Sequence, residues 1–273
     1  GTGFGRRILL KNHRLDPRVL PDRASRGLAE LGRLARSMGS QVFVKPMEHQ
    51  NIRTLINVRR TMLKNRARTD ALIQSIFRLY GGNVKLLNGR GALAAEVNDQ
   101  VRKMRQHELE IGVNLQPLVE IAEALREQIS ILDRQMRDIA SNNPTCRNFQ
   151  TIPGVGAVIA LSFYSAIGDP YRFERSRDVG AYLGLTPTLY QSGATSRRGR
   201  ISRHGNKLTR MHLITAATVL LCRIETESRL RTWGLELAQR VGFLKARVAV
   251  ARKLAVIMLG MWKSGSPFRP DGT

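Results

Sequence analysis

Positive charge limits the possible folds of this chain more than any other feature. Its 273 residues include 45 Lys and Arg against 21 Asp and Glu, which gives a formal net charge of +24 at pH 7. A compact body with this imbalance repels itself unless a polyanion or counterions neutralise it. Hydrophobic residues make up 42% of the chain, enough to build a core. The composition therefore predicts a folded protein that binds nucleic acid, with a ribosome-associated protein and a basic membrane-surface protein as alternatives.

The chain has two cysteines, Cys146 and Cys222, and neither belongs to a CxxC motif or a Cys/His cluster. This spacing argues against a structural zinc site or a disulfide framework, and we expect both thiols to be small buried hydrophobes. No apolar run reaches the length of a membrane span, and residues 1–11 lack the apolar core of a signal peptide. These features predict a cytoplasmic protein with no membrane partner.

A long basic helix is predicted over residues 49–80 and is ended by Gly81 and Gly82. Its apolar side chains form one predicted face, made of Ile52, Leu55, Val58, Met62, Leu72, Ile76 and Leu79. Cations dominate the rest, and Asp70 is the only acid in residues 51–80. Like charges four residues apart destabilise an isolated helix, and a phosphate backbone would relieve that repulsion. The alternative is an ordinary solvated face.

A second helix, over residues 118–139, has the clearest heptad pattern. Two sets of apolar residues recur at every seventh position: Leu118, Leu125, Leu132 and Ile139, and between them Ala122, Ile129 and Met136. We expect this a/d seam to pack against the 49–80 helix as an antiparallel coiled-coil arm. The alternative is an ordinary helix packed within its own domain. The Asn142-Asn143-Pro144 sequence predicts the end of the helix and a domain boundary.

The sequence Ile152-Pro153-Gly154-Val155-Gly156, followed by a helix from Ala157, has the pattern of a helix-hairpin-helix. Gly154 and Gly156 allow a tight turn and a close approach of the backbone to a partner. Free N–H groups at the start of the next helix can then bind a phosphate oxygen without reading base sequence. The alternative is a glycine-rich turn between two core helices.

The most basic stretch surrounds Gln191-Ser192-Gly193, because residues 179–224 contain no Asp or Glu. A serine in a loop among guanidinium groups suits attack on a phosphodiester, since the cations stabilise charge on the phosphate oxygens. A serine hydroxyl needs activation, and His204 is a possible base. From composition alone, the commoner role for a serine such as Ser192 is that of a hydrogen-bonding loop residue. The cations of this stretch are Arg197, Arg198, Arg200, Arg203, Lys207, Arg210 and Arg223.

Several blocks, in a fixed order, resemble the C-terminal domain of the insertion-sequence one-ten family of transposases, which includes Piv DNA invertases and bridge-RNA-guided recombinases. These blocks are residues 152–173 (IPGVGAVIALSFYSAIGDPYRF), 179–187 (VGAYLGLTP), 191–193 (QSG), 199–205 (GRISRHG) and 246–268 (ARVAVARKLAVIMLGMWKSGSPF). Residues 52–81 resemble the Arg-rich first helix of that family's coiled-coil insertion. Ordered blocks are more specific than any single motif.

The resemblance implies a RuvC-like domain with four acidic residues that bind a divalent metal such as Mg²⁺, and a Tnp domain whose serine is the nucleophile. That serine corresponds to Ser192. The acidic residues have no confident counterpart: Pro21 and Ala24 stand at two of the aligned positions, and Asp22 is a weak candidate one residue away. The chain also opens without Met, and we expect a fragment whose RuvC-like domain is truncated and whose metal site is not intact.

The predicted fold is mainly α, with a RuvC-like α/β remnant (1–47), a basic antiparallel coiled-coil arm (48–145) and a helical Tnp domain with the helix-hairpin-helix (146–273). The predicted function is DNA transposition and recombination, with DNA, a structured guide RNA and further copies of the chain (a dimer or tetramer) as partners. The alternatives are a non-catalytic DNA- or RNA-binding protein and a helix-hairpin-helix DNA glycosylase. The predicted nucleic-acid-binding residues are Gly154, Gly156, Arg197, Arg198, Arg200, Arg203, Lys207, Arg210, Arg59, Arg60, Lys64 and Arg66.

Overall fold

The computed structural model describes residues 45–89, 91–103, 108–192 and 195–270. Internal contacts divide the chain into residues 1–46 and 47–273, and the elements below belong to the second unit. The predicted RuvC-like remnant and Asp22 lie outside the described residues. The second unit is mainly helical, as predicted. Its elements are α3 (Met47–Leu79), α4 (Ala92–Lys103), α5 (Glu108–Asn142), α6 (Pro144–Gln150), α7 (Ala157–Ile167), η2 (Pro170–Arg172), η3 (Ser176–Asp178), α8 (Val179–Tyr182), β1 (Pro187–Ser192), β2 (Thr195–Ile201), α9 (Lys207–Cys222), α10 (Arg229–Val241) and α11 (Phe243–Ser264).

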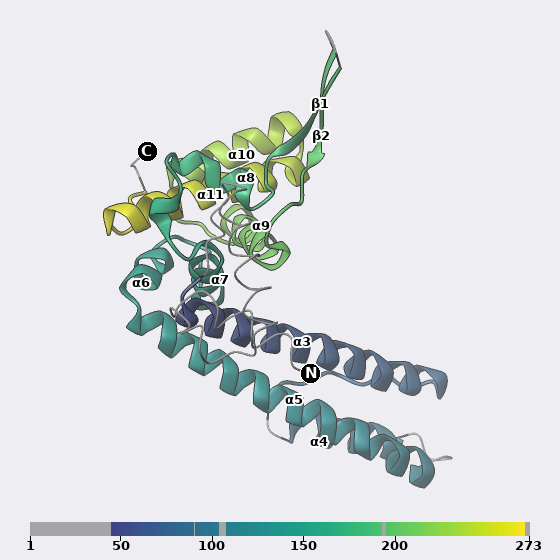
Figure 1. Cartoon of the computed structure of the whole chain (residues 1–273). Coiled ribbons are helices and arrows are strands. Elements are labelled where there is room, and N and C mark those ends of the chain that lie inside the picture. The colour runs from purple at the N-terminus through teal and green to yellow at the C-terminus, as the bar shows by residue number, and fades with distance from the viewer. Residues whose placement is uncertain (1–44, 90, 104–107, 193–194, 271–273) are drawn as a thin grey trace, which may run out of the picture. The chain divides into compact units, whose positions relative to one another are not determined.

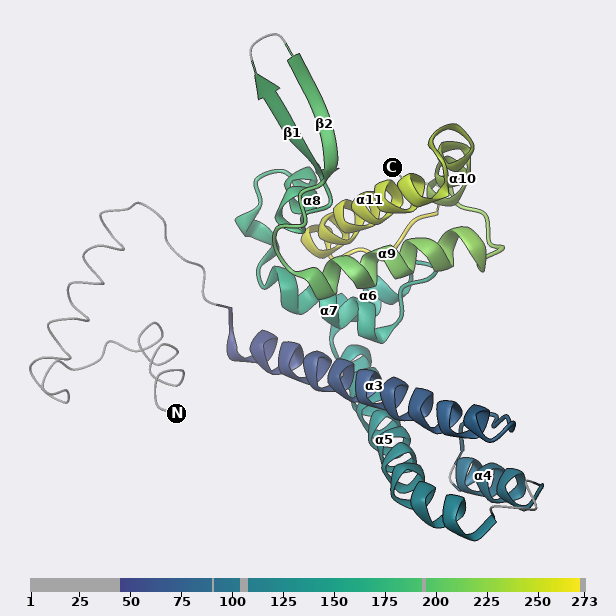
Figure 2. The same ribbon diagram turned by 90° about the vertical axis from the view of Figure 1, so that its right-hand side faces the viewer.

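Helices α3, α4 and α5 form an arm that leads away from the remaining helices, which we call the body (Figures 1 and 2). Near the body, Ile56 of α3 and Met136 of α5 belong to one buried cluster. At the far end, Phe77 and Leu115 belong to another. Later residues of α3 therefore lie beside earlier residues of α5, so the two helices pack antiparallel. Gly81, at a φ of 74°, ends α3 where the sequence predicts it.

Ion pairs fix the register of α3 against α5. Arg59 pairs with Asp133. Further out, an Nη of Arg126 donates to a carboxylate oxygen of Asp70 at 2.8 Å, and both side chains are only 9% exposed. Arg66, one turn before Asp70 on α3, lies 3.7 Å from the other carboxylate oxygen. Asp70, the only acid in its stretch of sequence, is thus held between two arginines inside the arm.

The burial of side chains on α5 and α3 tests the two apolar faces that the sequence predicts. Ala122, Ile129 and Met136 are buried, whereas Leu118 and its row are half-buried. On α3 the predicted face is confirmed only in part: Ile52 is buried and Leu55, Met62 and Ile76 are half-buried, but Val58, Leu72 and Leu79 are exposed. Besides Ile52, the buried stripe carries Ile56, Asp70, Ile73 and Phe77. A paired aspartate interrupts this stripe, so a search for apolar periodicity selects a neighbouring face.

The body forms around α11, which packs against α9, α10 and α8. Its buried side chains recur with helical spacing and include Val250, Leu254 and Met258. The start of α3 is attached to this body by an aromatic stack, in which the His49 ring lies 4.3 Å from that of Tyr164. Tyr164 in turn stacks on Trp262 of α11 at 4.8 Å. None of the described helices is long and apolar enough to cross a membrane.

The cysteines confirm one expectation and correct another. Cys146 is fully buried in α6, and burial raises its pKa to about 12, so it acts as a small apolar residue. Cys222 is exposed, contrary to the prediction. It is the last residue of α9, where the helix reaches the protein surface.

Candidate nucleic-acid interface

A β-hairpin carries Ser192. Strands β1 and β2 pair antiparallel, from Pro187 opposite Ile201 at the base to Ser192 opposite Thr195 at the far end. The hairpin extends away from the helices of the body (Figures 1 and 2). Ser192 is therefore the last residue of a strand rather than part of a long loop, and it lies at the far end of β1 from the body. This placement rests on the backbone alone.

The base of the hairpin is packed tightly against the body. Gly184, at a φ of 67°, lies so close to the following loop that an added Cβ would be 2.2 Å from the carbonyl oxygen of His204. At Gly205, which has a φ of 77°, an added Cβ would be 2.1 Å from the carbonyl oxygen of Tyr182. Only glycine fits these two positions. The loop that connects β2 to α9 is therefore held against residues 182–184.

Arg210 also joins residues 182–184 to the loop between β2 and α9. It is buried, and one Nη donates to the carbonyl oxygens of both Leu183 and His204 at 2.9 Å. Desolvation, and after it the charge of Arg203, lowers the pKa of Arg210. Because its guanidinium is already used to join two backbone segments, we leave Arg210 out of the proposed binding residues.

His204 is exposed at the base of the hairpin, beyond Ile201. A strand rises about 3.3 Å per residue, so the length of β1 separates Ser192 from Pro187 by roughly 16 Å. The backbone of Arg203, next to His204, is hydrogen-bonded to Gly184 on the body side of Pro187. His204 is therefore poorly placed to act as a base on Ser192 of its own chain.

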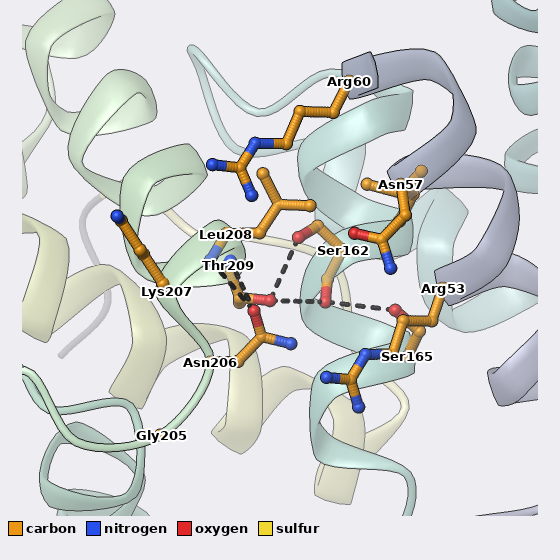
Figure 3. Close-up of a pocket in the computed structure, with 11 residues that line it drawn as sticks. Arg53, Asn57, Arg60, Ser162, Ser165, Gly205, Asn206, Lys207, Leu208 and Thr209 are labelled. Carbon is orange, nitrogen blue, oxygen red and sulfur yellow. Dashed lines mark hydrogen bonds between the residues drawn. The ribbon is translucent and has the colours of Figure 1, made fainter.

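A cavity of about 210 Å³ lies where α3, α7 and the start of α9 meet, and we call it the basic pocket (Figure 3). Arg53, Asn57 and Arg60 reach it from successive turns of α3. Lys207 lines it from the first turn of α9, and its ammonium group extends to the side away from Arg53 and Asn57 (Figure 3). No carboxylate is among the described residues that line it, which are Arg53, Ile56, Asn57, Arg60, Ser162, Ser165, Gly205, Asn206, Lys207, Leu208 and Thr209.

The floor of the basic pocket is polar but buried. Ser162, Ser165 and Thr209 are each no more than 3% exposed. The hydroxyl of Thr209 donates to the carbonyl oxygen of Ser162, and the two hydroxyl oxygens are 3.1 Å apart. Asn206 caps α9 by accepting hydrogen bonds from the N–H groups of Leu208 and Thr209. These bonds hold α7 and the start of α9 in a fixed arrangement beneath the cations.

The electrostatic potential near the pocket is positive. His212, one turn further along α9, has its pKa lowered to about 4. Burial is the main cause, and the charges of Arg59 and Arg60 on α3 add to it. The Nδ1 of His212 is buried and without a hydrogen-bond partner. His212 is therefore neutral at pH 7.

A larger groove of about 1160 Å³ lies between the hairpin base and α11. Its lining is mainly apolar, with Leu185, Ile201, Leu244 and Val248 among its members. Cations surround this apolar surface: Arg200, Arg203, Lys245, Arg252 and Lys253. The Lys253 ammonium lies 4.7 Å from the ring centroid of Trp233, which also lines the groove. Two of the predicted binding residues, Arg200 and Arg203, therefore border an apolar surface that carries an indole.

The other predicted cations are distributed between the arm and the hairpin. Arg59 and Arg66 take part in the ion pairs of the arm, whereas Lys64 is exposed. Arg197 and Arg198 belong to β2, where their backbones oppose Tyr190 and Leu189. Of the arm and α9 residues that the sequence predicts for binding, Arg60 and Lys207 line the same pocket.

The two predicted glycines occupy one turn, residues 151–156 between α6 and α7, which we call the glycine turn. Gly154, at a φ of 87°, faces inward, and an added Cβ would be 3.0 Å from the carbonyl oxygen of Ala216 on α9. Gly156 is exposed, and an added Cβ would meet nothing within 4 Å. It is the N-cap residue of α7 and provides no side-chain cap. The start of α7 is therefore open to an acceptor from outside.

Sequence reasoning missed three parts of this region. Arg53 and Asn57 share a helical face with Arg60 at i, i+4 and i+7, a polar periodicity that a search for apolar residues passes over. Asn206 directly before a helix is an N-cap signal. The signal for the hairpin is Ser192-Gly193 after a short run that contains Thr, Leu and Tyr, a pattern typical of β-hairpins.

Comparison with known proteins agrees with this arrangement of elements. Residues 146–232 match the model of the transposase IS116/IS110/IS902 family. The match extends from the start of α6 through the glycine turn and the hairpin to α10. Over these residues the chain is similar to this family of insertion-sequence transposases, which is the insertion-sequence one-ten family that the sequence motifs indicate.

Relatives support the same assignment over more of the chain. The transposase for insertion sequence element IS1111A of Coxiella burnetii is 28% identical over 282 residues, covering 98% of this chain and 74% of the relative. A probable family 20 transposase of Pseudomonas aeruginosa is 28% identical, covering 83% and 68%. The transposase for IS1328 of Yersinia enterocolitica is 33% identical, covering 53% and 43%. The chain thus spans part of the length of each of these three relatives.

Proposed function

We propose that this chain is a transposase and recombinase subunit in which the Ser192 hydroxyl attacks a DNA phosphodiester. The observation that supports this most directly is the position of Ser192 at the tip of the hairpin. A nucleophile on such a projection can enter a duplex held by basic surfaces elsewhere in the assembly.

The proposed step exchanges one phosphoester for another. The serine oxygen forms a bond to phosphorus, and the bond between phosphorus and one deoxyribose oxygen breaks. The serine proton passes through solvent to the leaving oxygen. Because an ester replaces an ester, no oxidant or separate energy source is required, and attack of the freed hydroxyl reverses the step. Cations around the phosphate stabilise the charge that develops on its oxygens.

We propose that divalent metal, Mg²⁺ by family resemblance, is supplied through acidic residues of a partner subunit. Among the residues that the structure describes, no group of three His, Cys, Asp or Glu is arranged to hold a metal ion. The described part of the chain therefore does not fit a resident metal site, and we derive no step through one.

A denaturing gel tests the nucleophile. A labelled duplex with the ends of an insertion sequence is incubated with this chain, Mg²⁺ and a full-length transposase of the family. We expect a covalent adduct of this chain in the mixture and little from this chain alone. Ser192→Ala should abolish the adduct while the dissociation constant for the duplex changes by less than about twofold, because every cation is retained. Ser196→Ala, on the opposite strand, is the matched control and should leave the adduct intact.

Two outcomes would contradict this proposal in different ways. An adduct that persists in Ser192→Ala removes this serine from the reaction. A strong Ser192-dependent adduct from the chain alone shows that the acidic site is not supplied by a partner. A chain that binds DNA with normal affinity but forms no adduct in any mixture supports the second candidate function, a non-catalytic DNA- or RNA-binding protein. The intact basic pocket and groove, which do not depend on Ser192, are the observations that favour it.

Structured guide RNA is the second proposed partner, and the apolar groove beside the hairpin supports it. Unpaired bases stack on aromatic and apolar surfaces while cations bind the backbone. Trp233 and the five cations around the groove offer both.

For the glycine turn we propose a helix-hairpin-helix role, in which the open start of α7 binds backbone phosphate. Self-association is proposed through the arm, where the apolar residues Ile121 and Ile131 are exposed.

A further inference from the structure

We propose that the basic pocket binds a single phosphate group and that this phosphate joins the arm to the body. The proposal deepens the proposed function, since a nucleic-acid backbone is the expected source of the group. It assigns a ligand to a cavity formed by residues far apart in sequence: Arg53 and Arg60 of α3, and Lys207 at the start of α9.

The charges of the pocket require an anion. The guanidinium groups of Arg53 and Arg60 reach one cavity of about 210 Å³ that Lys207 also lines, and no carboxylate is found among the described residues lining it. In Figure 3 the guanidinium groups of Arg53 and Arg60 both extend from α3 toward the segment that begins α9. Folding gains nothing from bringing these like charges together. Burial is the main cause of the lowered pKa of His212, and the charges of Arg59 and Arg60 lower it further.

The size and chemistry of the pocket select a phosphate. A cavity of about 210 Å³ is smaller than the usual range for drug-sized or cofactor ligands, roughly 300–1,000 Å³. None of the described residues that line it is aromatic, so they offer no surface on which a base can stack. The lining instead combines the guanidinium donors of Arg53 and Arg60 with the amide of Asn57. Arginine forks match the oxygens of a phosphate, and the N-terminal end of α9 adds a favourable dipole.

The position of the pocket gives the bound phosphate a mechanical consequence. Ile52 and Ile56 of α3 already belong to the buried cluster that contains α7. A phosphate bound between the arginines of α3 and the start of α9 would add a second, polar connection between arm and body. Asn206 and Lys207 follow the loop that Gly184, Gly205 and Arg210 hold in place. A backbone phosphate in the pocket is therefore held at a fixed place relative to the base of the hairpin that carries Ser192.

Paired charge-matched variants test the proposal. Arg53→Gln with Arg60→Gln removes two pocket cations, and Arg68→Gln with Arg78→Gln removes two exposed cations of the same helix outside the pocket. Both double variants have the same net charge. Affinity for a labelled duplex is measured by fluorescence anisotropy at several salt concentrations. We expect the pocket variant to lose about tenfold or more in affinity and roughly 0.9 in the salt slope, and the control to lose less than about threefold.

A second measurement separates backbone phosphate from free phosphate. Inorganic phosphate should raise the Tm of the wild-type chain relative to chloride at equal ionic strength, because a ligand that binds only the folded state stabilises it. The pocket variant should lose this rise, and the control should keep it. If the variant loses the rise but binds the duplex like the control, the pocket takes a free or terminal phosphate. If wild type binds no duplex yet shows the rise, the nucleic-acid function fails and the pocket remains.

Equal losses in both double variants, in duplex affinity and in the phosphate-induced rise of Tm, would overturn the proposal. Such a result would mean that Arg53 and Arg60 act only through net charge. Circular dichroism in the absence of phosphate verifies that the pocket variant is folded. Lys207→Gln is a third variant from the opposite wall of the pocket. Its affinity and phosphate response should change in the same direction as those of the α3 variant.

Discussion

The glycine turn places two glycines in different surroundings. Gly154 adopts a left-handed φ and packs against the backbone of α9, whereas Gly156 is exposed at the start of α7. A side chain at Gly154 disturbs the contact between the turn and α9. A side chain at Gly156 disturbs nothing within the chain and changes only what α7 presents to a partner. Binding and stability can therefore be separated by substituting one glycine at a time.

The prediction at the residue scale concerns Gly156. Gly156→Asp and Gly156→Asn both provide an N-cap for α7 and should leave stability unchanged or raise it by a few tenths of a kcal/mol. Only the aspartate adds negative charge at the proposed phosphate site. We expect Gly156→Asp to weaken duplex binding about fivefold more than Gly156→Asn, and equally for unrelated sequences, because a backbone contact reads no bases. Anisotropy with two unrelated duplexes measures this; equal affinities of the two variants would rule out a phosphate contact at this turn.

At the scale of the element, the buried face of α3 contains a charged residue that needs partners. Its buried stripe includes Asp70, which is held by Arg126 of α5 and Arg66 of α3 itself. A buried carboxylate without a partner is costly, whereas a buried pair replaced by apolar side chains of similar size can be neutral. The arm thus uses a polar contact to set register at its centre, with apolar clusters on either side.

Chemical denaturation tests this contact at the scale of the element. Arg126→Met leaves Asp70 with only the more distant Arg66, and we expect the free energy of unfolding to fall by about 3 kcal/mol. Adding Asp70→Leu to Arg126→Met should recover most of that loss. If Arg126→Met alone costs less than about 1 kcal/mol, the arm is held by its apolar clusters and the pair adds little.

The elements also show how far the sequence alone could predict the structure. The antiparallel packing of α3 and α5, the end of α3 at Gly81 and the break before Pro144 follow from local signals, because glycine, proline and heptad spacing act on their near neighbours. The face of α3 followed only in part, since a long-range partner decides that Asp70 is buried. The basic pocket is of the same kind: Arg60 and Lys207 were each predicted to bind, but their meeting is a property of the tertiary fold.

Across the whole molecule, positive charge is distributed over separate features. The arm carries exposed cations such as Lys64, the junction with the body holds the basic pocket, and the groove beside the hairpin is surrounded by five more cations. Each feature can neutralise phosphates independently of the others. A duplex or a folded RNA that contacts several of them at once releases the counterions of every phosphate it places there.

The prediction for the whole molecule is a steep salt dependence. If about six phosphates are neutralised, the logarithm of the association constant falls with a slope of roughly −5 against the logarithm of salt concentration, which is about a thousandfold loss from roughly 50 to 200 mM. Titrations of a labelled duplex across this range measure the slope. A single-stranded probe should give a shallower slope, because fewer counterions are released per phosphate. A nearly flat response for both probes would mean that the basic faces are only solvated, and the high net charge would then need an explanation other than nucleic acid.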